Sequence, residues 1–509
     1  MNIANFLLRS GLLYRDSCAL ALGRIGVASY GQLSARAAKL AGALQSNPNL
    51  EVGARGAIIA KNKPEYLEII YGCWHAGLIV VPINSKLHVN EMSFILEDSG
   101  AKLCFISDDL CANSRSVESS ELEKIIEIGT SDYIGLFEGK ESQIVSCDGD
   151  AIAWIFYTSG TTGRPKGAAL SHRNLLAMCH CYFTDVDCEG VSKTMLHIAP
   201  MSHGSGLYSL AQIMRGRVNV FPESGGFDVK EVFSLIQSWP NVCFFAAPTM
   251  IKRLVDSDTE ADTVNLETII YGGGPMYLGD LKAGLKRFGA KFSQLYGQGE
   301  TPMTITAMSE RIHADNTHPR WENRMKSVGT AQSAVEVKVV NQSGEELNAG
   351  ETGENRLHGV AAAASREVRG VGDAGVQHRL RVPRGGAAGD EGLHAVRRGL
   401  REPLPVREPG KNPVASKRPW AGAGAAGFAG SGRLPRHPGR GSGERRDPID
   451  GAAGLLGLPP TPKPSSSRSS LRRTCTAQQH RLLPLAMATG GPTPQLGGVT
   501  KGYGGISYL

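Results

Sequence analysis

Helix-like and strand-like segments alternate along the first 359 residues of the chain. The segment 29–45 carries apolar residues at the spacing of one helix face: Leu33, Ala37, Leu40 and Leu44. Beyond it, apolar runs typical of buried strands alternate with further helical segments, at 53–60, 63–77, 78–84, 88–100 and 101–107. This alternation predicts an α/β fold with a large domain of parallel or mixed sheets flanked by helices.

The loop YTSGTTGRPKG, residues 157–167, directly follows the apolar run 151–157, which has the pattern of a central strand. In parallel sheets, ligands bind in the loops at the carboxyl ends of strands. The loop combines hydroxyl donors, glycines that let N–H groups turn inward, and one cation: Thr158, Ser159, Gly160, Thr161, Thr162, Gly163 and Lys166. Ser171 then has the pattern of a helix N-cap. These groups suit a polyphosphate.

Two other interpretations of this loop are weaker. A polar surface loop seldom has this density and order of glycine and threonine. A P-loop nucleotide site is disfavoured because no Lys-Ser or Lys-Thr pair ends the motif at the start of a helix.

Four further features are candidates for chemistry, each with a structural alternative. The glycines 272–274 follow the apolar run 266–271 and would let the backbone approach a flat base, although a tight turn alone is the alternative. Tyr296 could stack on that base or be a core tyrosine. Glu300 could hold Mg²⁺ between phosphates or be a surface glutamate. His203 could be functional or a structural histidine.

The loop resembles the signature loop of the adenylate-forming enzymes, a group that includes acyl-CoA synthetases, luciferases and peptide-synthetase adenylation domains. Three later stretches resemble this family in the same order: IAPMSHGSG at 198–206, IIYGGGPM at 269–276 and YGQGETPMTIT at 296–306. The stretch 327–354 resembles the small β-rich subdomain that follows them. The resemblance covers residues 1 to 354, with the β-rich end at about 325–354, and it implies the fold of that domain.

The resemblance implies roles for individual residues. His203 would line the acyl pocket and, with Glu300, serve catalysis, while Glu300 would hold the metal. The ATP site would comprise the loop residues named above together with Gly272, Gly273, Gly274, Pro275, Tyr296, Gly297, Gln298, Gly299, Glu300 and Thr301. One departure concerns Gly299, which stands where the family usually has a threonine that meets the α-phosphate. Thr301 or a backbone N–H is expected to replace that contact.

The charge of the chain is divided between two regions. From Val360 to the end there are 23 Lys+Arg and 9 Asp+Glu, whereas residues 1–359 hold 32 basic and 39 acidic residues. The net charge of +7 therefore does not indicate a nucleic-acid-binding protein as a whole. The segment 355–509 is dominated by Gly, Ala, Arg and Pro, and we expect it to be largely disordered because it has little apolar surface to bury.

Residues that the family needs beyond 354 are not found in this segment. The ribose-binding aspartate has only faint counterparts in Asp373 and Asp390, the hinge to the C-terminal domain is missing, and Lys501 lacks the context of the adenylating lysine. Because Gly, Ala, Arg and Pro have GC-rich codons, we interpret 355–509 as a frameshift product that replaces the C-terminal catalytic domain. The alternative is a genuine basic tail that binds anions or nucleic acid by charge.

The cysteines and the apolar segments bear on the compartment. The ten cysteines form no CxxC pair, which fits reduced thiols in a cytoplasmic protein. Cys179-His180-Cys181 could be half of a metal site, but no second half is visible and core packing is favoured. The N-terminus lacks the pattern of a signal peptide, and the apolar region 69–83 is too short to span a membrane. We therefore expect a soluble protein.

The resemblance implies ATP-dependent activation of a carboxylic acid, fatty or ring-bearing, to acyl-AMP and then to acyl-CoA. The cofactors and co-substrates would be ATP, Mg²⁺ and CoA, with no nucleic-acid partner. Two alternatives stay open: a non-catalytic nucleotide-binding remnant, and an acyl-AMP ligase that acts with a carrier protein. As written, the chain is expected to be weakly active or inactive, because the missing lysine stabilises transition-state charge.

Overall fold

The structure is a computed structural model of the 509-residue chain. It describes residues 1–110, 116–158, 164–188, 190–348, 351 and 353–359. Almost all of the segment 355–509, including Asp373, Asp390 and Lys501, lies outside the described residues. The prediction that this segment is disordered therefore concerns residues that the structure does not describe.

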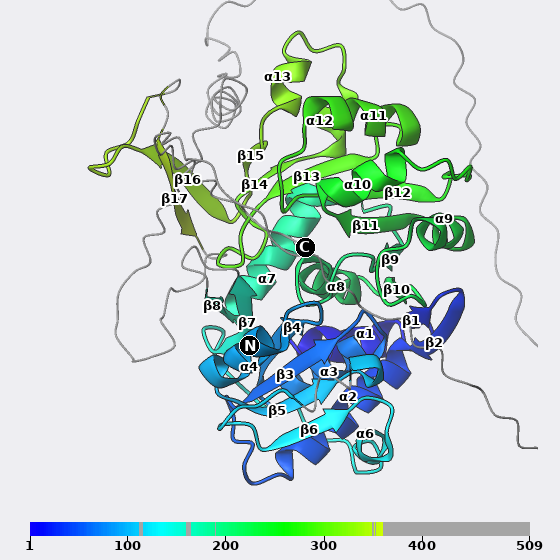
Figure 1. Cartoon of the computed structure of the whole chain (residues 1–509), viewed down its shortest axis with the longest axis vertical. Coiled ribbons are helices and arrows are strands. Elements are labelled where there is room, and N and C mark those ends of the chain that lie inside the picture. Colours follow the sequence, from blue (N-terminus) through cyan, green and yellow to red (C-terminus); the bar gives the residue numbers. More distant parts are fainter. Residues whose placement is uncertain (111–115, 159–163, 189, 349–350, 352, 360–509) are drawn as a thin grey trace, which may run out of the picture. The chain divides into compact units, whose positions relative to one another are not determined.

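Six strands form the first sheet, which carries the signature loop (Figure 1). In spatial order they are β6 (Lys124–Glu127), β5 (Ala101–Ile106), β3 (Arg55–Ala60), β4 (Ile79–Asn84), β7 (Ile152–Thr158) and β8 (Lys166–Ser171). All neighbours are parallel except β7 and β8, which form an antiparallel pair at one edge. The strand predicted to be central, β7, is thus the next to last.

Nine strands form the second sheet. In spatial order they are β15 (Thr330–Ala331), β14 (Thr306–Met308), β13 (Phe292–Tyr296), β12 (Leu266–Tyr271), β11 (Val242–Ala246), β9 (Thr194–Leu196), β10 (Val218–Phe221), β1 (Cys18–Leu22) and β2 (Ile25–Ser29). The run from β13 to β1 is parallel, whereas β15, β14 and β2 are antiparallel to their neighbours. The predicted α/β fold with parallel and mixed sheets is therefore confirmed.

Helices join most of these strands. They are α1 (Asn5–Leu13), α2 (Tyr30–Gln45), α3 (Glu65–His75), α4 (Val89–Ser99), α6 (Ser131–Gly135), α7 (His172–Cys181), α8 (Gly204–Met214), α9 (Val229–Ser238), α10 (Pro248–Val255), α11 (Leu278–Phe288), α12 (Glu310–Ala314) and α13 (Trp321–Met325). Two short turns are η1 (Asp108–Leu110) and the π-helical η2 (Tyr182–Val186). None of the described helices is long and apolar enough to cross a membrane.

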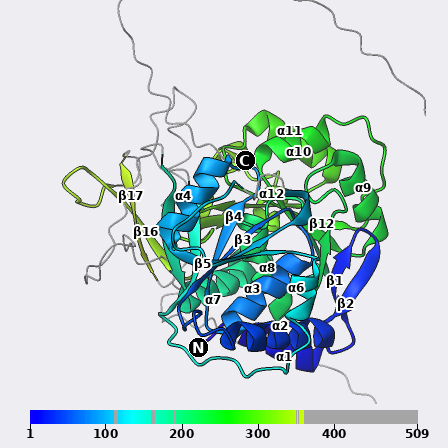
Figure 2. The same cartoon turned by 60° about the horizontal axis from the view of Figure 1, so that its bottom comes forward.

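Sequence signals account for where several helices begin and which face they bury. Ser29 and Ser171 each accept a hydrogen bond from the backbone N–H three residues on, and the side chain at that position reaches back to the cap. The predicted N-cap role of Ser171 is thus confirmed. The predicted apolar face of α2 is also confirmed, since Leu33, Ala37, Leu40 and Leu44 are all buried. Figure 2 shows α1, α2 and α3 next to one another.

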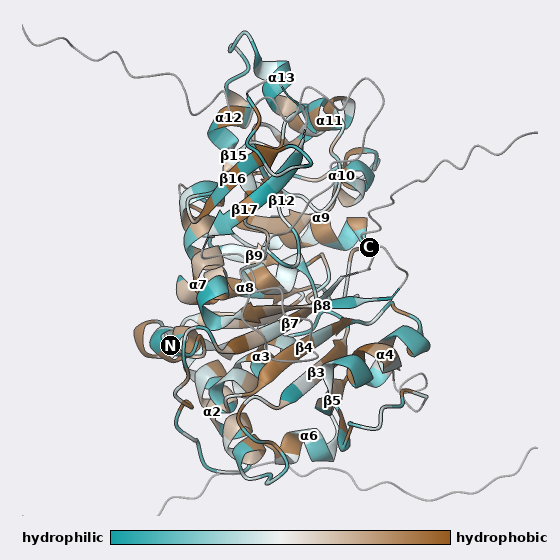
Figure 3. Ribbon diagram, turned by 90° about the vertical axis from the view of Figure 1, so that its left-hand side faces the viewer, coloured by the Kyte–Doolittle hydropathy of each residue, from teal (hydrophilic) through white to brown (hydrophobic). Residues whose placement is uncertain are grey.

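The cores lie on both faces of the first sheet and around the second. One buried cluster includes Trp74, Trp154 and several residues of α8, among them Leu207 and Tyr208. A second cluster covers the opposite face of that sheet, with Ile59, Val81 and Ile155. In Figure 3 the strands β3, β4 and β7 show the brown of apolar residues, whereas α4 shows much teal. Burial on two faces explains the continuous apolar runs in the sequence.

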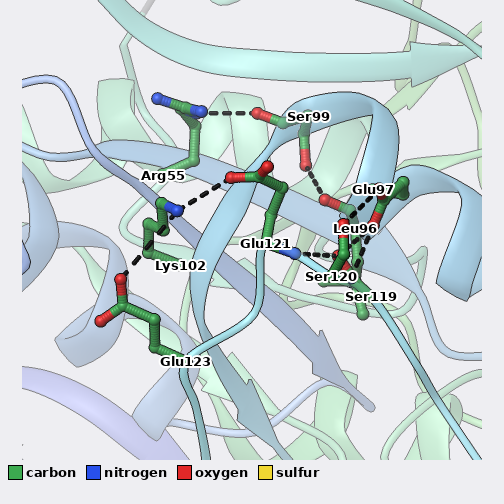
Figure 4. A network of polar contacts seen from close by, with 9 residues as sticks. All are labelled: Arg55, Leu96, Glu97, Ser99, Lys102, Ser119, Ser120, Glu121 and Glu123. Carbon is green, nitrogen blue, oxygen red and sulfur yellow. Dashed lines mark hydrogen bonds and ion pairs between the residues drawn. The ribbon is translucent and has the colours of Figure 1, made fainter.

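A polar network attaches the segment 116–123 to α4 and β5 (Figure 4). Glu97 on α4 accepts hydrogen bonds from Ser119 Oγ at 2.7 Å and from the Ser120 N–H at 2.8 Å. Lys102 on β5 contacts Glu121 at 2.8 Å. These groups are partly or largely exposed, so the network orders the segment more than it stabilises the fold.

A two-stranded antiparallel sheet ends the described chain. It pairs β16 (Val335–Val340) with β17 (Glu354–Gly359), from Val340 opposite Glu354 to Val335 opposite Gly359. This is the small β-rich subdomain expected at about 325–354. Its last strand continues five residues beyond Glu354, so regular pairing persists past the point where the change of sequence character was placed.

The described cysteines are free thiols, as the sequence predicts. Cys179 and Cys181 are buried on α7, where desolvation raises the thiol pKa of Cys181 to about 11. Among the described residues no group of three or more His, Cys, Asp or Glu side chains is arranged to hold a metal ion. Cys179 belongs to the buried cluster around Trp74 and Trp154.

Candidate active site

The ends of β7 and β8 hold the described part of the signature loop. Thr158, the last residue of β7, lies opposite Lys166, the first residue of β8. The Lys166 side chain is exposed, so its ammonium group is available to a ligand. Five loop residues with a predicted role lie outside the described residues, so the structure does not test that role: Ser159, Gly160, Thr161, Thr162 and Gly163.

Phe156 and Thr158 project from the same face of β7, because they are two residues apart on a strand. Both lie against Gly299. A Cβ atom at Gly299 would be 2.4 Å from Phe156 Cδ1 and 2.8 Å from Thr158 Cγ2. The signature strand and the segment 296–301 are therefore in direct contact, although more than 130 residues separate them in the chain.

His203 packs on the same aromatic ring. It is the residue before α8, and its ring packs edge-on against Phe156 with the ring centroids 5.3 Å apart. Its Nδ1 lies 2.8 Å from Ser202 Oγ. Burial lowers the pKa of His203 to about 4, so the imidazole is neutral at pH 7. A neutral imidazole can donate or accept a hydrogen bond without adding charge to the site.

The glycine turn 272–274 lies at the carboxyl end of β12, beside the end of β13. A Cβ atom at Gly272 would be 2.6 Å from the carbonyl oxygen of Leu295, so only glycine fits there. Gly273 has φ 74°, the left-handed region that favours glycine. Because β12 and β13 are parallel neighbours, this turn and Tyr296 emerge at the same edge of the sheet. Pro275 follows the turn.

The segment 297–303 folds back on itself after β13. A Cβ atom at Gly297 would be 2.4 Å from Met303 Cα, and Met303 itself has φ 65°, which is uncommon for a side-chain-bearing residue. Thr301 is 1% exposed, and its Oγ1 accepts a hydrogen bond from the Gln298 N–H at 3.2 Å. This bond ties the side chain of Thr301 to the backbone of the same turn, and its hydroxyl hydrogen can still be donated.

Glu300 lies in that turn and is partly exposed. No hydrogen bond or ion pair joins its side chain to another described residue. A single carboxylate fits Mg²⁺ only when phosphate oxygens and water supply the remaining ligands, which is the usual arrangement for this cation. The donor set is thus compatible with Mg²⁺ that arrives with a nucleotide.

Met303 and Phe245 close the other side of this arrangement. A Cβ atom at Gly204, the residue after His203, would be 2.8 Å from Phe245 Cε1 and 2.9 Å from Met303 Cε. Four motifs that are far apart in the sequence therefore converge on Phe156, Phe245 and Met303. Sequence reasoning missed these three residues, because an apolar residue inside a strand or turn carries no signal of its position beside a site.

An open hollow of about 640 Å³ beside α4 is distinct from this arrangement. Its lining contains none of the predicted site residues and includes Glu97 and Glu118. The charged residues of the lining are both carboxylates, and they would repel a phosphate.

The described residues of the predicted site thus lie at or beside the carboxyl ends of β7, β12 and β13 in an α/β protein, and a family comparison identifies the class of protein. Residues 13–364 match the family model described as AMP-binding enzyme. The match covers more than half of the chain, which therefore belongs to this family.

Individual relatives are named as ligases of several acids. The chain is 28% identical over 330 residues to a feruloyl-CoA synthase from Amycolatopsis sp, covering 64% of each protein. It is 32% identical over 262 residues to the long-chain-fatty-acid–CoA ligase FadD13 of Mycobacterium tuberculosis, covering 49% of this chain and 50% of the relative. The chain thus spans about 64% of the length of the feruloyl-CoA synthase.

A solved structure supports the fold. The N-terminal domain of FACL13 from Mycobacterium tuberculosis superposes with a TM-score of 0.64 at 23% identity, covering 72% of this chain and 92% of that domain. At this identity the likeness concerns the fold alone.

Proposed function

We propose that the chain is an acid-activating ligase that uses ATP to convert a carboxylic acid into an acyl-adenylate. A carboxylate oxygen attacks the α-phosphorus, the bond to the β-phosphate breaks, and pyrophosphate leaves. The thiol of CoA then attacks the acyl carbon, AMP leaves, and a thioester forms. The acid is fatty or ring-bearing, a proposal supported by the relatives named for feruloyl and long-chain fatty acids.

One observation carries this proposal: Phe156 is in contact with both His203 and Gly299. It supports an arrangement in which a neutral histidine borders the acid, the segment 296–301 borders the phosphates, and Phe156 contacts both. The reaction joins a carboxylate to a phosphorus atom, so it requires such adjacency.

The remaining residues have roles on the phosphate side. Thr158 and Lys166, with the loop between them, would bind the triphosphate, and Glu300 would hold Mg²⁺ against it. The Mg²⁺ would neutralise charge on the pyrophosphate as it leaves. Gly272, Gly273 and Gly274 would border the adenine, and Tyr296 would stack on it.

The test is the affinity of the full chain for Mg²⁺–ATP, measured by calorimetry. Lys166→Ala should weaken binding by about 10- to 100-fold, the range that the loss of one charged hydrogen bond implies. Lys230→Ala removes an exposed lysine from α9 and is the matched control, expected to bind as the wild type does. Equal affinities for all three proteins would contradict the proposed phosphate site.

The second candidate is a nucleotide-binding protein that does not complete the reaction. It is favoured by the family match, which ends at residue 364, and by the lack of a convincing adenylating lysine in the segment that follows. A related proposal is that this segment results from a frameshift. Sequencing the gene around codons 355–365 and translating all frames tests it: a neighbouring frame should restore a ribose-binding aspartate, a hinge and a late lysine.

A further inference from the structure

The side chain of Asn62 clamps the loop that leads to His203. This loop, residues 197–203, connects β9 to α8. Asn62 Nδ2 donates to the carbonyl oxygens of His197 at 2.8 Å and Ala199 at 2.7 Å, and its Oδ1 accepts from the Met201 N–H at 2.9 Å. Asn62 is 5% exposed, so water does not compete for these three bonds.

The clamp joins two sheets. Asn62 follows the carboxyl end of β3 in the six-stranded sheet, whereas the loop follows β9 in the nine-stranded sheet. The backbone N–H of Asn62 is itself fixed, because it donates to the Gly225 carbonyl at 3.1 Å. Only a side-chain amide offers two donors and an acceptor on a stem this short. An aspartate would lose both donors and face two carbonyl oxygens with a negative charge.

The side chain of His197 secures the same loop from inside. Its Nε2 lies 3.0 Å from Asn219 Oδ1 and its Nδ1 lies 2.8 Å from Ser205 Oγ. Because Asn219 Oδ1 can only accept, Nε2 carries the proton and Nδ1 accepts from Ser205. The loop is therefore fixed at its start and again in the first turn of α8, on both sides of His203.

We propose that Asn62 is a positioning residue, which holds the loop 197–203 so that His203 is fixed against Phe156 before any acid binds. The assignment of His203 to the acid-binding side of the site rests on the proposed function. The hydrogen bonds of Asn62 to the loop do not depend on that function. A loop ordered in the free protein loses little further freedom on binding, so the acid is held more tightly than by a loose loop.

Asn2 provides a matched control. Its Nδ2 donates to the carbonyl oxygens of Trp74 at 2.6 Å and Val145 at 3.0 Å, and its Oδ1 accepts from the Ala4 N–H at 2.9 Å. It is 2% exposed. Asn2 thus makes the same three bonds at the same depth but contacts none of the candidate site residues. Asn2→Ala reports what the loss of such a clamp does to the fold in general.

The first experiment is amide hydrogen exchange by mass spectrometry on the full chain. In the wild type, the Met201 amide should exchange slowly although it lies in a loop. Asn62→Ala should accelerate exchange in the peptide 198–206 by roughly tenfold or more, and Asn62→Asp should do so too. Asn2→Ala should leave that peptide unchanged. The proposal would be overturned if the wild-type peptide exchanged at the rate of a free loop, or if neither Asn62 variant exchanged faster. The wild-type measurement tests the proposal even if the variants do not fold.

The second experiment separates positioning from general destabilisation. In acid-dependent pyrophosphate release with dodecanoate or ferulate, Asn62→Ala should raise KM for the acid at least fivefold and leave KM for ATP within twofold. Asn2→Ala should change neither. Equal changes in both constants would contradict a positioning role. If the wild type releases no pyrophosphate with either acid while the exchange results hold, the proposed function fails in this chain and the clamp stands.

Discussion

The contact between Gly299 and Phe156 makes a quantitative prediction about stability. Gly299 does not have the left-handed φ that favours glycine, yet a Cβ atom there would lie 2.4 Å from Phe156 Cδ1 and 2.9 Å from Cε1. Ordinary contacts of this kind are about 3.5–4.0 Å, so Gly299→Ala must displace the ring. Phe156 is 7% exposed and also packs on His203, which leaves it little room to move. Overpacking of this kind costs about 1–3 kcal/mol.

The complementary change tests the same contact from the other side. Phe156→Ala should cost about 3–5 kcal/mol, because it removes a buried ring and leaves a cavity. In the double variant the new methyl group no longer meets the ring, but its contact with Thr158 Cγ2 at 2.8 Å persists, so its own cost should fall without vanishing. The two changes should therefore couple by about 1–2 kcal/mol.

The assay is thermal unfolding of the four proteins of the cycle, with Gly226→Ala as a control. A Cβ atom at Gly226 would meet nothing within 4 Å, so this change should shift the midpoint little. The reasoning is refuted if Gly299→Ala is as mild as the control. It is also refuted if the two changes add within about 0.5 kcal/mol, the limit expected for independent sites.

Two further predictions concern buried charge and pH. Asp187 is 5% exposed and lies 2.5 Å from Arg217 Nη1, so Asp187→Ala should strand a buried cation and cost about 3–5 kcal/mol, measurable as a lower unfolding midpoint. Burial lowers the pKa of His197, His203 and His313 to about 4, below the unfolded value of about 6.5. Between those two pKa values the unfolded chain binds more protons than the folded chain. The free energy of unfolding should therefore decrease as the pH falls from 6.5 to 4, by up to about 1.4 kcal/mol per pH unit for each histidine. An unfolding midpoint that does not change from pH 7 to pH 5 would contradict this.

The fold could be predicted in outline because its elements carry local signals. The apolar face of α2 and the helix cap at Ser171 could be predicted because periodicity and capping depend on residues a few positions apart. The position of β7 next to the edge was not, because an apolar run reports burial on two faces and not the order of strands. Nor was the antiparallel pairing of β7 with β8, because the sequence alone suggests only that a loop separates them.

The candidate site could be predicted as motifs but not as an arrangement. Glycines 272 and 297 stand out in the sequence, yet the need for them comes from Leu295 and Met303, which approach through the tertiary structure. Asn62 carries no signal at all, since its three partners lie more than 130 residues away. The role of Asn62 depends on the contact between the two sheets, and no local sequence pattern predicts that contact.

The central claim is that this chain forms an acyl-adenylate. The most direct measurement is mass spectrometry of reactions that contain the purified full chain, Mg²⁺–ATP and dodecanoate or ferulate, with Lys166→Ala in parallel. The account predicts an acyl-AMP product that requires the acid, is absent with ATP alone and is reduced in the variant. The contradicting result is a chain that binds ATP but yields no acyl-AMP with either acid, which is the behaviour of a nucleotide-binding remnant.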